Sequence, residues 1–299
     1  MNRVTTTTSN RLMLSDLNNA NLAMIRAQQK MSSQKQISKA SDDPARSLTA
    51  LGHRGTLQRS SQFQRNATDA RSWMVAGDTA LTSSVEEITH VRTLVIQARS
   101  GASDPNAREA LAAEVKTVRE SLLALGNTKH LNRPIFAGTS DSSAAFDAAG
   151  NYLGDDNSVT RPIAPEVSVE VNRTGTNVFG TFDGVDPMNG NLFQMLDAIS
   201  AAILSGDQAG MSNGINALDS AMDRIESAQV ELGARARQVD DVMARTEFSD
   251  IDTQRALSEV EDVDIAQAMI DASAKNFSYQ AALSTAAKVM QMSLLDFMR

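Results

Sequence analysis

Hydrophobic positions near the C-terminus recur at alternating spacings of four and three residues, which is the pattern of a single seam along a long helix. The members of this seam are Ile265, Met269, Ala272, Asn276, Tyr279, Leu283, Ala286 and Met290. Only Asn276 departs from its apolar character. A stripe of this length needs a cover, so we expect it to pack against another part of this chain or against another chain.

A second seam with the same spacing lies near the N-terminus, and its members are Met13, Leu17, Ala20, Met24, Ala27 and Met31. Flexible Met side chains make this seam pliable, which suits packing in an assembly. The two ends also differ in charge. Residues 1–41 carry six basic residues and one acid, whereas residues 256–299 carry six acids and three bases. Opposite charge favours the two ends lying together.

Helices joined by short turns are expected between residues 41 and 126. Asp43 is a good N-cap and Pro44 suits the first helical position, so a long helix is expected to begin there. Ser100 to Pro105 repeats this pattern, with Gly101 ending one helix and Asp104-Pro105 opening the next, which runs to Gly126. A long helix, a tight turn and a returning helix form an antiparallel pair.

Composition changes in the middle of the chain. Residues 138–190 hold seven of the 16 Gly and three of the six Pro, too many for helix interiors. Glu166 to Val171 alternates strictly between polar and apolar positions, which predicts a half-buried strand. We therefore expect a small β-rich insertion between helical segments.

Helical patterns resume after the insertion. One helix is expected from Leu192 to about Ile203, and a heptad seam then runs from Ile215 to Thr246. The acidic segment Glu259 to Asp264 is expected to bend or break the helix before the terminal one.

The predicted fold class is mainly α, with long antiparallel helices in a rod-like bundle or coiled coil. We expect residues 1–40 and 259–299 to form a terminal coiled-coil polymerisation domain, residues 41–137 and 191–258 a helical core domain, and residues 138–190 an outer insertion.

Little in the sequence indicates catalysis or ligand binding. The formal charge of −8 argues against general nucleic-acid binding, and the lack of Cys removes disulfides and Cys-based metal sites. His53, His90 and His130 lack a second ligand at metal spacing, and no phosphate-binding or zinc-protease motif occurs. Capping explains the pair Asp42 and Asp43 better than an acid–base site does. We predict no enzyme activity, cofactor or metal, and neither a signal peptide nor a membrane span.

Several short motifs, in this order along the chain, resemble the flagellin superfamily. They are Ser41-Asp42-Asp43-Pro44-Ala45, Asn132 to Thr139, Glu261 to Ala266, Tyr279 to Leu283 and Ser293 to Phe297. The Asp-Asp-Pro variant, the Ile-Phe-Ala-Gly-Thr segment before one small insertion and the modest length are more similar to its hook-filament junction branch than to filament flagellins.

The resemblance implies a secreted structural subunit that passes unfolded through the flagellar export apparatus. It also implies self-assembly at the extracellular hook-filament junction, between the hook-side junction protein (hook-associated protein 1) and flagellin, and binding to an export chaperone. Terminal segments of the family are disordered in the free monomer and form the inner tube on assembly. The subunit-interface residues expected from the seams and this resemblance are Met13, Leu17, Met24, Met31, Ile265, Met269, Asn276, Leu283, Met290, Leu294 and Phe297.

Two alternatives remain open from the sequence. A small filament flagellin would share the same motifs but occur in thousands of copies along the filament. A cytoplasmic coiled-coil scaffold would instead keep stably helical ends in the monomer and would not be exported.

Overall fold

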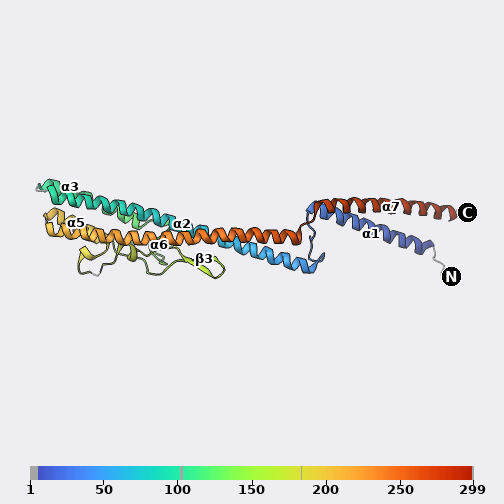
Figure 1. Cartoon of the computed structure of the whole chain (residues 1–299), viewed down its shortest axis with the longest axis horizontal. Coiled ribbons are helices and arrows are strands. Elements are labelled where there is room, and N and C mark those ends of the chain that lie inside the picture. The colour runs from blue at the N-terminus through green and yellow to red at the C-terminus, as the bar shows by residue number, and fades with distance from the viewer. Residues whose placement is uncertain (1–5, 102–103, 183, 298–299) are drawn as a thin grey trace. The chain divides into compact units, whose positions relative to one another are not determined.

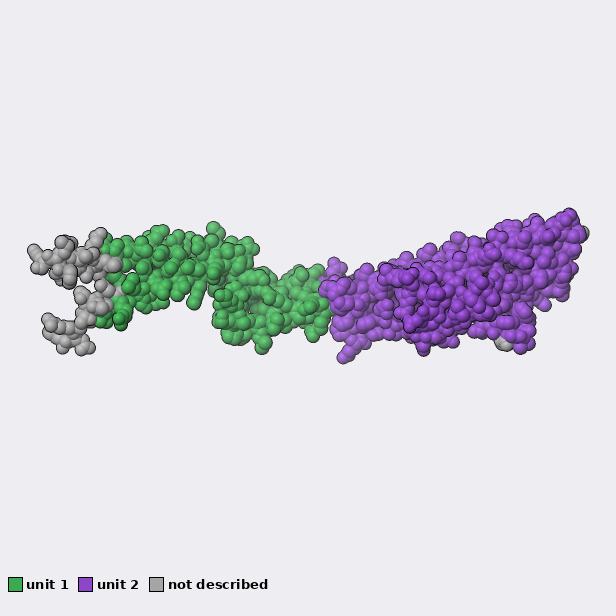
Figure 2. Space-filling view, turned by 180° about the vertical axis from the view of Figure 1, so that it is seen from behind, with its two compact units in different colours: residues 1–59, 249–299 green, residues 60–248 purple. Residues whose placement is uncertain are grey.

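The computed structural model describes residues 6–101, 104–182 and 184–297, with side-chain environments for residue 8 and for residues 11–100, 104–182 and 184–288. About 74% of the chain is helical, which confirms the mainly α prediction. The chain divides into two compact units, shown in different colours in Figure 2. Unit 1 contains residues 1–59 and 249–299, and unit 2 contains residues 60–248.

Unit 2 is built around long helices (Figure 1). They are most of α2 (Pro44–Gly101), α3 (Pro105–Gly126), α5 (Leu192–Ser205) and most of α6 (Gln208–Glu261). The expected starts of α2 and α3 are confirmed: the Oδ1 atom of Asp43 accepts the Arg46 N–H at 3.0 Å, and that of Asp104 accepts the Asn106 N–H at 3.0 Å. α5 ends at Gly206, whose left-handed φ of 74° suits a residue without a Cβ.

The buried core lies in unit 2, and its members fall between Ala67 and Val239. The seam predicted from Ile215 to Thr246 is confirmed, because every member is buried or half-buried on α6. The early part of α2 differs, since Leu48 and Leu51, which follow the same apolar pattern, are largely exposed in unit 1.

The insertion packs on the helices through a few short elements. β1 (Lys129–His130) pairs with β2 (Arg133–Pro134), and β3 (Thr160–Ala164) pairs with β4 (Val167–Glu170), both antiparallel. α4 (Gly175–Phe179) and a short 3₁₀ helix, η1 (Pro187–Asn189), follow. β4 confirms the strand predicted from the alternation of residues 166–171. The first sheet precedes residue 138, so strand structure begins earlier than the composition indicates.

An aromatic cluster fixes the insertion to the helices. Phe146 lies 5.4 Å from Phe179 and 4.9 Å from Phe193, and Phe136 lies 5.3 Å from Phe179, measured between ring centroids. All four Phe side chains are almost fully buried. Edge-to-face packing of this kind adds about 0.5–1.5 kcal/mol per pair beyond the area that the rings bury.

Unit 1 contains α1 (Thr6–Ser33), α7 (Ile265–Phe297), the start of α2 and the end of α6. The expected break before the terminal helix is confirmed, because α6 ends at Glu261 and the Oδ1 atom of Asp264 accepts the Ala266 N–H at 2.9 Å at the start of α7. Among the residues of unit 1 whose burial is described, the buried apolar side chains are only Ile37, Ala50, Ala268 and Ala286. The described part of unit 1 therefore has almost no core of its own.

Candidate assembly interface

α1 and α7 lie side by side and antiparallel in unit 1 (Figure 1), as the opposite charges of the two ends indicate. All six members of the N-terminal seam, from Met13 to Met31, are half-buried, while the flanking side chains are mostly exposed. The seam predicted from the spacing is thus the face of α1 that is turned away from solvent. Leu12, Leu14, Leu22 and Ile25 lie outside it and are exposed.

On α7 the covered strip consists mainly of small side chains. Its members are Ala268, Ala272, Tyr279, Ala282 and Ala286, of which Ala268 and Ala286 are buried. Small side chains let two helix backbones approach closely, which explains why this strip, and not the larger side chains beside it, is covered in the single chain.

Four of the eight members of the predicted α7 seam lie beside this strip. Ile265, Met269 and Leu283 are 50%, 55% and 48% exposed, and Asn276 is also exposed and accepts a hydrogen bond from Gln280 at 3.3 Å. Of the seven seam members whose side chains the structure describes, Ala272, Tyr279 and Ala286 belong to the covered strip. The side chains of Met290, Leu294 and Phe297 lie outside those that the structure describes. The exposed members, with Ile270 and Phe277, form an outward face that we call the outer face of α7.

A buried carboxylate connects the parts of unit 1. Glu261, at the end of α6, has a side chain only 7% exposed and pairs with Lys35 at 2.8 Å and with Arg54 of α2. Beside it, the Gln36 N–H donates to the Glu261 carbonyl at 2.7 Å, and the Val263 N–H donates to the Gln34 carbonyl at 3.0 Å. We call this group the Glu261 clasp. The sequence patterns did not reveal it, although the opposite charges of the two ends were a signal.

The loop between α1 and α2 is held by the first Asp of the Asp-Asp-Pro segment. The Asp42 carboxylate accepts the Lys39 N–H at 2.9 Å and the Ser38 N–H at 3.2 Å. The Lys39 hydrogen bond is the main reason that the pKa of Asp42 lies below its ordinary value. Asp42 therefore orders the loop while Asp43 caps α2, which agrees with the capping interpretation.

Over the described part of the chain, no three or more His, Cys, Asp or Glu side chains converge into a group that could hold a metal ion. His90 instead pairs with Glu114 at 3.0 Å, and His130 packs on Trp73 with ring centroids 5.6 Å apart. No described helix is both long and apolar enough to cross a membrane.

Two family models match the chain. The bacterial flagellin N-terminal helical region matches residues 4–141, and the bacterial flagellin C-terminal helical region matches residues 215–298. Together these ranges cover well over half of the chain. They leave out residues 142–214, which hold most of the insertion and α5.

Similar proteins include flagellar components from several bacteria. "Flagellar hook-associated protein 3" of Salmonella typhimurium is 24% identical over 96% of this chain and 96% of its own length. The Escherichia coli protein of the same name is 25% identical over 79% of this chain and 80% of its own length. "Flagellin" of Bacillus subtilis is 23% identical over 93% of both chains.

Solved structures share the fold. FlgL of Bacillus cereus superimposes with a TM-score of 0.60 at 19% identity, over 69% of this chain and 99% of that one. The flagellar junction protein FlgL of Legionella pneumophila does so with a TM-score of 0.56 at 17% identity, over 73% of this chain and 100% of that one. The chain therefore belongs to the flagellin family, as a structural component of the bacterial flagellum and not an enzyme.

Proposed function

We propose that this chain is the adaptor subunit of the hook-filament junction, where it joins the hook-side junction protein to the flagellin filament by helical self-assembly. One observation carries the proposal: among its described residues unit 1 has almost no core, yet it presents the outer face of α7 and the exposed apolar side chains of α1 to solvent. Large uncovered apolar surface on a helix pair is typical of a subunit interface.

In this proposal residues 1–40 and 259–299 form the polymerisation domain. Residues 41–137 and 191–258 form the helical core domain, and residues 138–190 face outward. Neighbouring subunits would cover Ile265, Met269 and Leu283, with Met290, Leu294 and Phe297 continuing the same seam. Ile265, Met269 and Leu283 are each about half exposed, so covering each side chain would stabilise the assembly by about 1 kcal/mol.

The proposed partners are further copies of this chain, hook-associated protein 1, flagellin and an export chaperone. The proposed location is outside the cell at the boundary of hook and filament. Support comes from relatives named hook-associated protein 3 that match over most of their length.

Immunogold labelling of flagella from the bacterium that encodes this chain tests the proposal directly. We expect label only at the hook-filament boundary. The double substitution Met269→Ser and Leu283→Ser should remove that label and leave the helical content of the purified monomer unchanged. Val230→Ser is the matched control, because Val230 is 70% exposed on α6 but belongs to neither α1 nor α7. Normal junction labelling by the double variant would contradict the proposal.

A filament flagellin is the second candidate, because flagellins match this chain over nearly its whole length. It predicts label along the entire filament. The same labelling experiment therefore separates the two functions.

A further inference from the structure

Arg224 on α6 is a half-buried arginine in unit 2 that forms no ion pair with any described residue. Its Nε and Nη2 atoms are buried and have no hydrogen-bond partner among the described residues. Burial lowers the pKa of the guanidinium from its ordinary value. Because the pKa of Arg is so high, the group stays charged, and an unpaired buried charge is costly.

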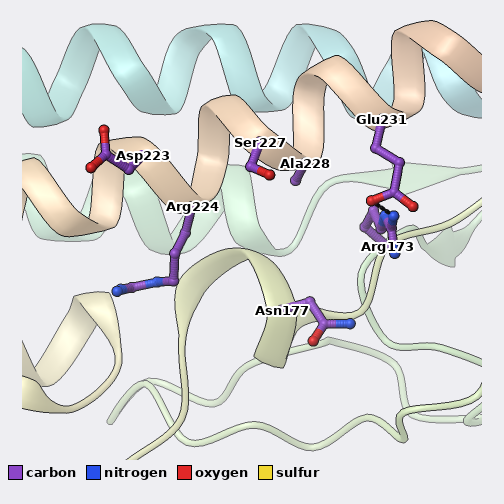
Figure 3. A pocket seen from close by; sticks show the side chains of 7 residues that line it. All are labelled: Arg173, Asn177, Asp223, Arg224, Ser227, Ala228 and Glu231. Atoms are coloured by element: carbon purple, nitrogen blue, oxygen red, sulfur yellow. Dashed lines mark ion pairs between the residues drawn. The ribbon is translucent and has the colours of Figure 1, made fainter.

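Nearby arginines are paired, so Arg224 differs from its neighbours. Arg235 pairs with Glu170 at 2.6 Å and with Glu231 at 3.1 Å, and Arg173 also pairs with Glu231 (Figure 3). Glu231 is thus already engaged by two cations. The other acid in the described lining of the pocket is Asp223, and Figure 3 shows its side chain pointing away from that of Arg224.

A pocket of about 430 Å³ opens beside Arg224. Asn177 and Ser227 line it with an amide and a hydroxyl for which no side-chain hydrogen bond is found within the described part of the chain, and Ala228 adds a small apolar wall. The Nε atom of Arg173, also buried and without a partner among the described residues, belongs to a second guanidinium in the lining. The pocket therefore offers several donors suited to an anion with more than one acceptor oxygen.

We propose that this pocket, the Arg224 pocket, binds a carboxylate side chain of a neighbouring copy of the chain. The inference rests on the proposed self-assembly. A guanidinium matches a carboxylate with two parallel hydrogen bonds. The chain has 36 acidic and 28 basic residues, so every copy presents a surplus of carboxylates to its neighbours. Glu109 and Glu120 on α3, for example, are exposed and take part in no ion pair with any described residue.

Pairing between copies also explains why the charge is left unpaired in one chain. In a head-to-tail assembly, different patches of identical subunits meet, so a cation on one copy and an acid on the next can be separate in the monomer. The cost of the unpaired charge is then recovered only on assembly, which favours the assembled state and fixes its register.

Two measurements on the substitution Arg224→Met test the inference. We expect the purified monomer to unfold at the same or a higher temperature, because an unpaired buried charge has been removed. We also expect junction labelling to fall about tenfold, the effect of losing one buried charge pair of about 1.4 kcal/mol between subunits. Arg92→Met is the matched control, because Arg92 already pairs with Asp219 at 2.9 Å within the chain, and its junction labelling should stay normal.

Three results would overturn the inference. Normal junction labelling by Arg224→Met would do so, and so would a monomer clearly destabilised by that change, since the guanidinium would then serve the fold. The third is a combination of two observations: inorganic phosphate raises the melting temperature of the wild-type monomer, and Arg224→Met is incorporated normally. Together they would assign the pocket to a free anion. Wild-type label away from the hook-filament boundary would instead contradict the proposed function.

Charge reversal identifies the chemistry of the occupant. Arg224→Glu should abolish motility, and variants selected for restored motility should replace one exposed Asp or Glu of the same chain with Lys or Arg. Restored motility without any such acid-to-base replacement would overturn the assignment of a carboxylate.

Discussion

Glu261 joins three segments of unit 1 that are distant in the sequence. Its buried carboxylate faces Lys35, which follows α1, and Arg54, which lies in α2, while its carbonyl accepts the Gln36 N–H. Because the side chain is nearly inaccessible to water and its partners are half exposed, its pairing is stronger than that of a surface ion pair. The Glu261 clasp therefore holds the α1–α7 pair at the end of α6.

Glu261→Gln tests this role. We expect the change to weaken the clasp by about 1–3 kcal/mol, less than the roughly 3–5 kcal/mol for breaking a fully buried pair, because both cations keep access to water. Amide hydrogen exchange should become about 5- to 150-fold faster at Gln36 and Val263, whose N–H groups form the adjacent backbone bridge. Glu259→Gln, at an exposed position of the same helix, should leave both exchange rates unchanged.

The last two residues of the Ile-Phe-Ala-Gly-Thr segment, Gly138 and Thr139, contact Asp155. Gly138 has a left-handed φ of 69°, and a Cβ there would overlap Asp155. The Asp155 carboxylate accepts the Thr139 hydroxyl and the Thr139 N–H, both at 2.7 Å. Gly138 and Thr139 are thus required by local geometry, which the resemblance locates in the sequence but does not explain.

Acid should weaken this contact. The hydrogen bond from the Thr139 hydroxyl is the main cause that lowers the pKa of Asp155 from 3.8 to about 2. A lowered pKa in the folded state means that the contact stabilises the fold above pH 3.8 and loses this effect as the pH falls toward 2. Asp155→Asn should therefore lower the melting temperature at pH 7 and flatten its dependence on pH between 4 and 2. Asp141→Asn, at a nearby exposed site, should reproduce the wild-type profile.

At the scale of elements, the sequence predicted the helices and their first residues well. It predicted only in part which side of α7 is buried against α1. Asp43-Pro44 and Asp104-Pro105 act locally, so their effect can be inferred from a few residues. Which strip of α7 meets α1 depends on how closely two backbones approach. The spacing of apolar residues predicted that the larger side chains would be buried. In the structure the covered side chains are mainly small ones such as Ala268 and Ala282.

The spacing of hydrophobic residues could not predict the Arg224 pocket or the Glu261 clasp, for a related reason. Both depend on polar side chains brought together from segments far apart, and the acid or base at such a position resembles any other charged residue of an exposed helix face. The aromatic cluster was missed because its members, such as Phe146 and Phe193, lie in or beside loops without a regular spacing.

Two glycines of α6 should respond in opposite ways to the same substitution. Gly233 has open space where a Cβ would be, so Gly233→Ala should raise the stability of unit 2 by up to about 1 kcal/mol through helix propensity. At Gly214 a Cβ would lie 2.8 Å from Cγ1 of Ile199 on α5, so Gly214→Ala should lower it. Thermal unfolding followed by circular dichroism measures both. A shift of the same sign for the two variants would show that α5 and α6 do not pack as described.

At the scale of the whole molecule, stability and assembly are assigned to different parts of the chain. The core lies between Ala67 and Val239, all within unit 2, while the uncovered apolar helix pair belongs to unit 1. Outside the Arg224 pocket, changes in unit 2 should therefore affect mainly stability, and changes in unit 1 mainly assembly.

Deletion of residues 268–299 tests this separation. Since the deletion removes no member of the core cluster, we expect the main thermal transition to remain cooperative and to shift by only a few degrees. Junction labelling should be lost completely. A truncated chain that melts without a cooperative transition, or one that still assembles, would contradict the division.

The pairing of α1 with α7 also has a consequence for the order in which the chain folds. Ser33 at the end of α1 and Ile265 at the start of α7 are separated by more than 200 residues. At synthesis rates of about 5–20 residues per second, roughly 10–50 s pass between the synthesis of α1 and that of α7. During that time a strongly cohesive Leu- and Ile-rich seam would invite aggregation. The seam of α1 consists mainly of Met and Ala, so we expect it to be less prone to aggregate before α7 has been synthesised.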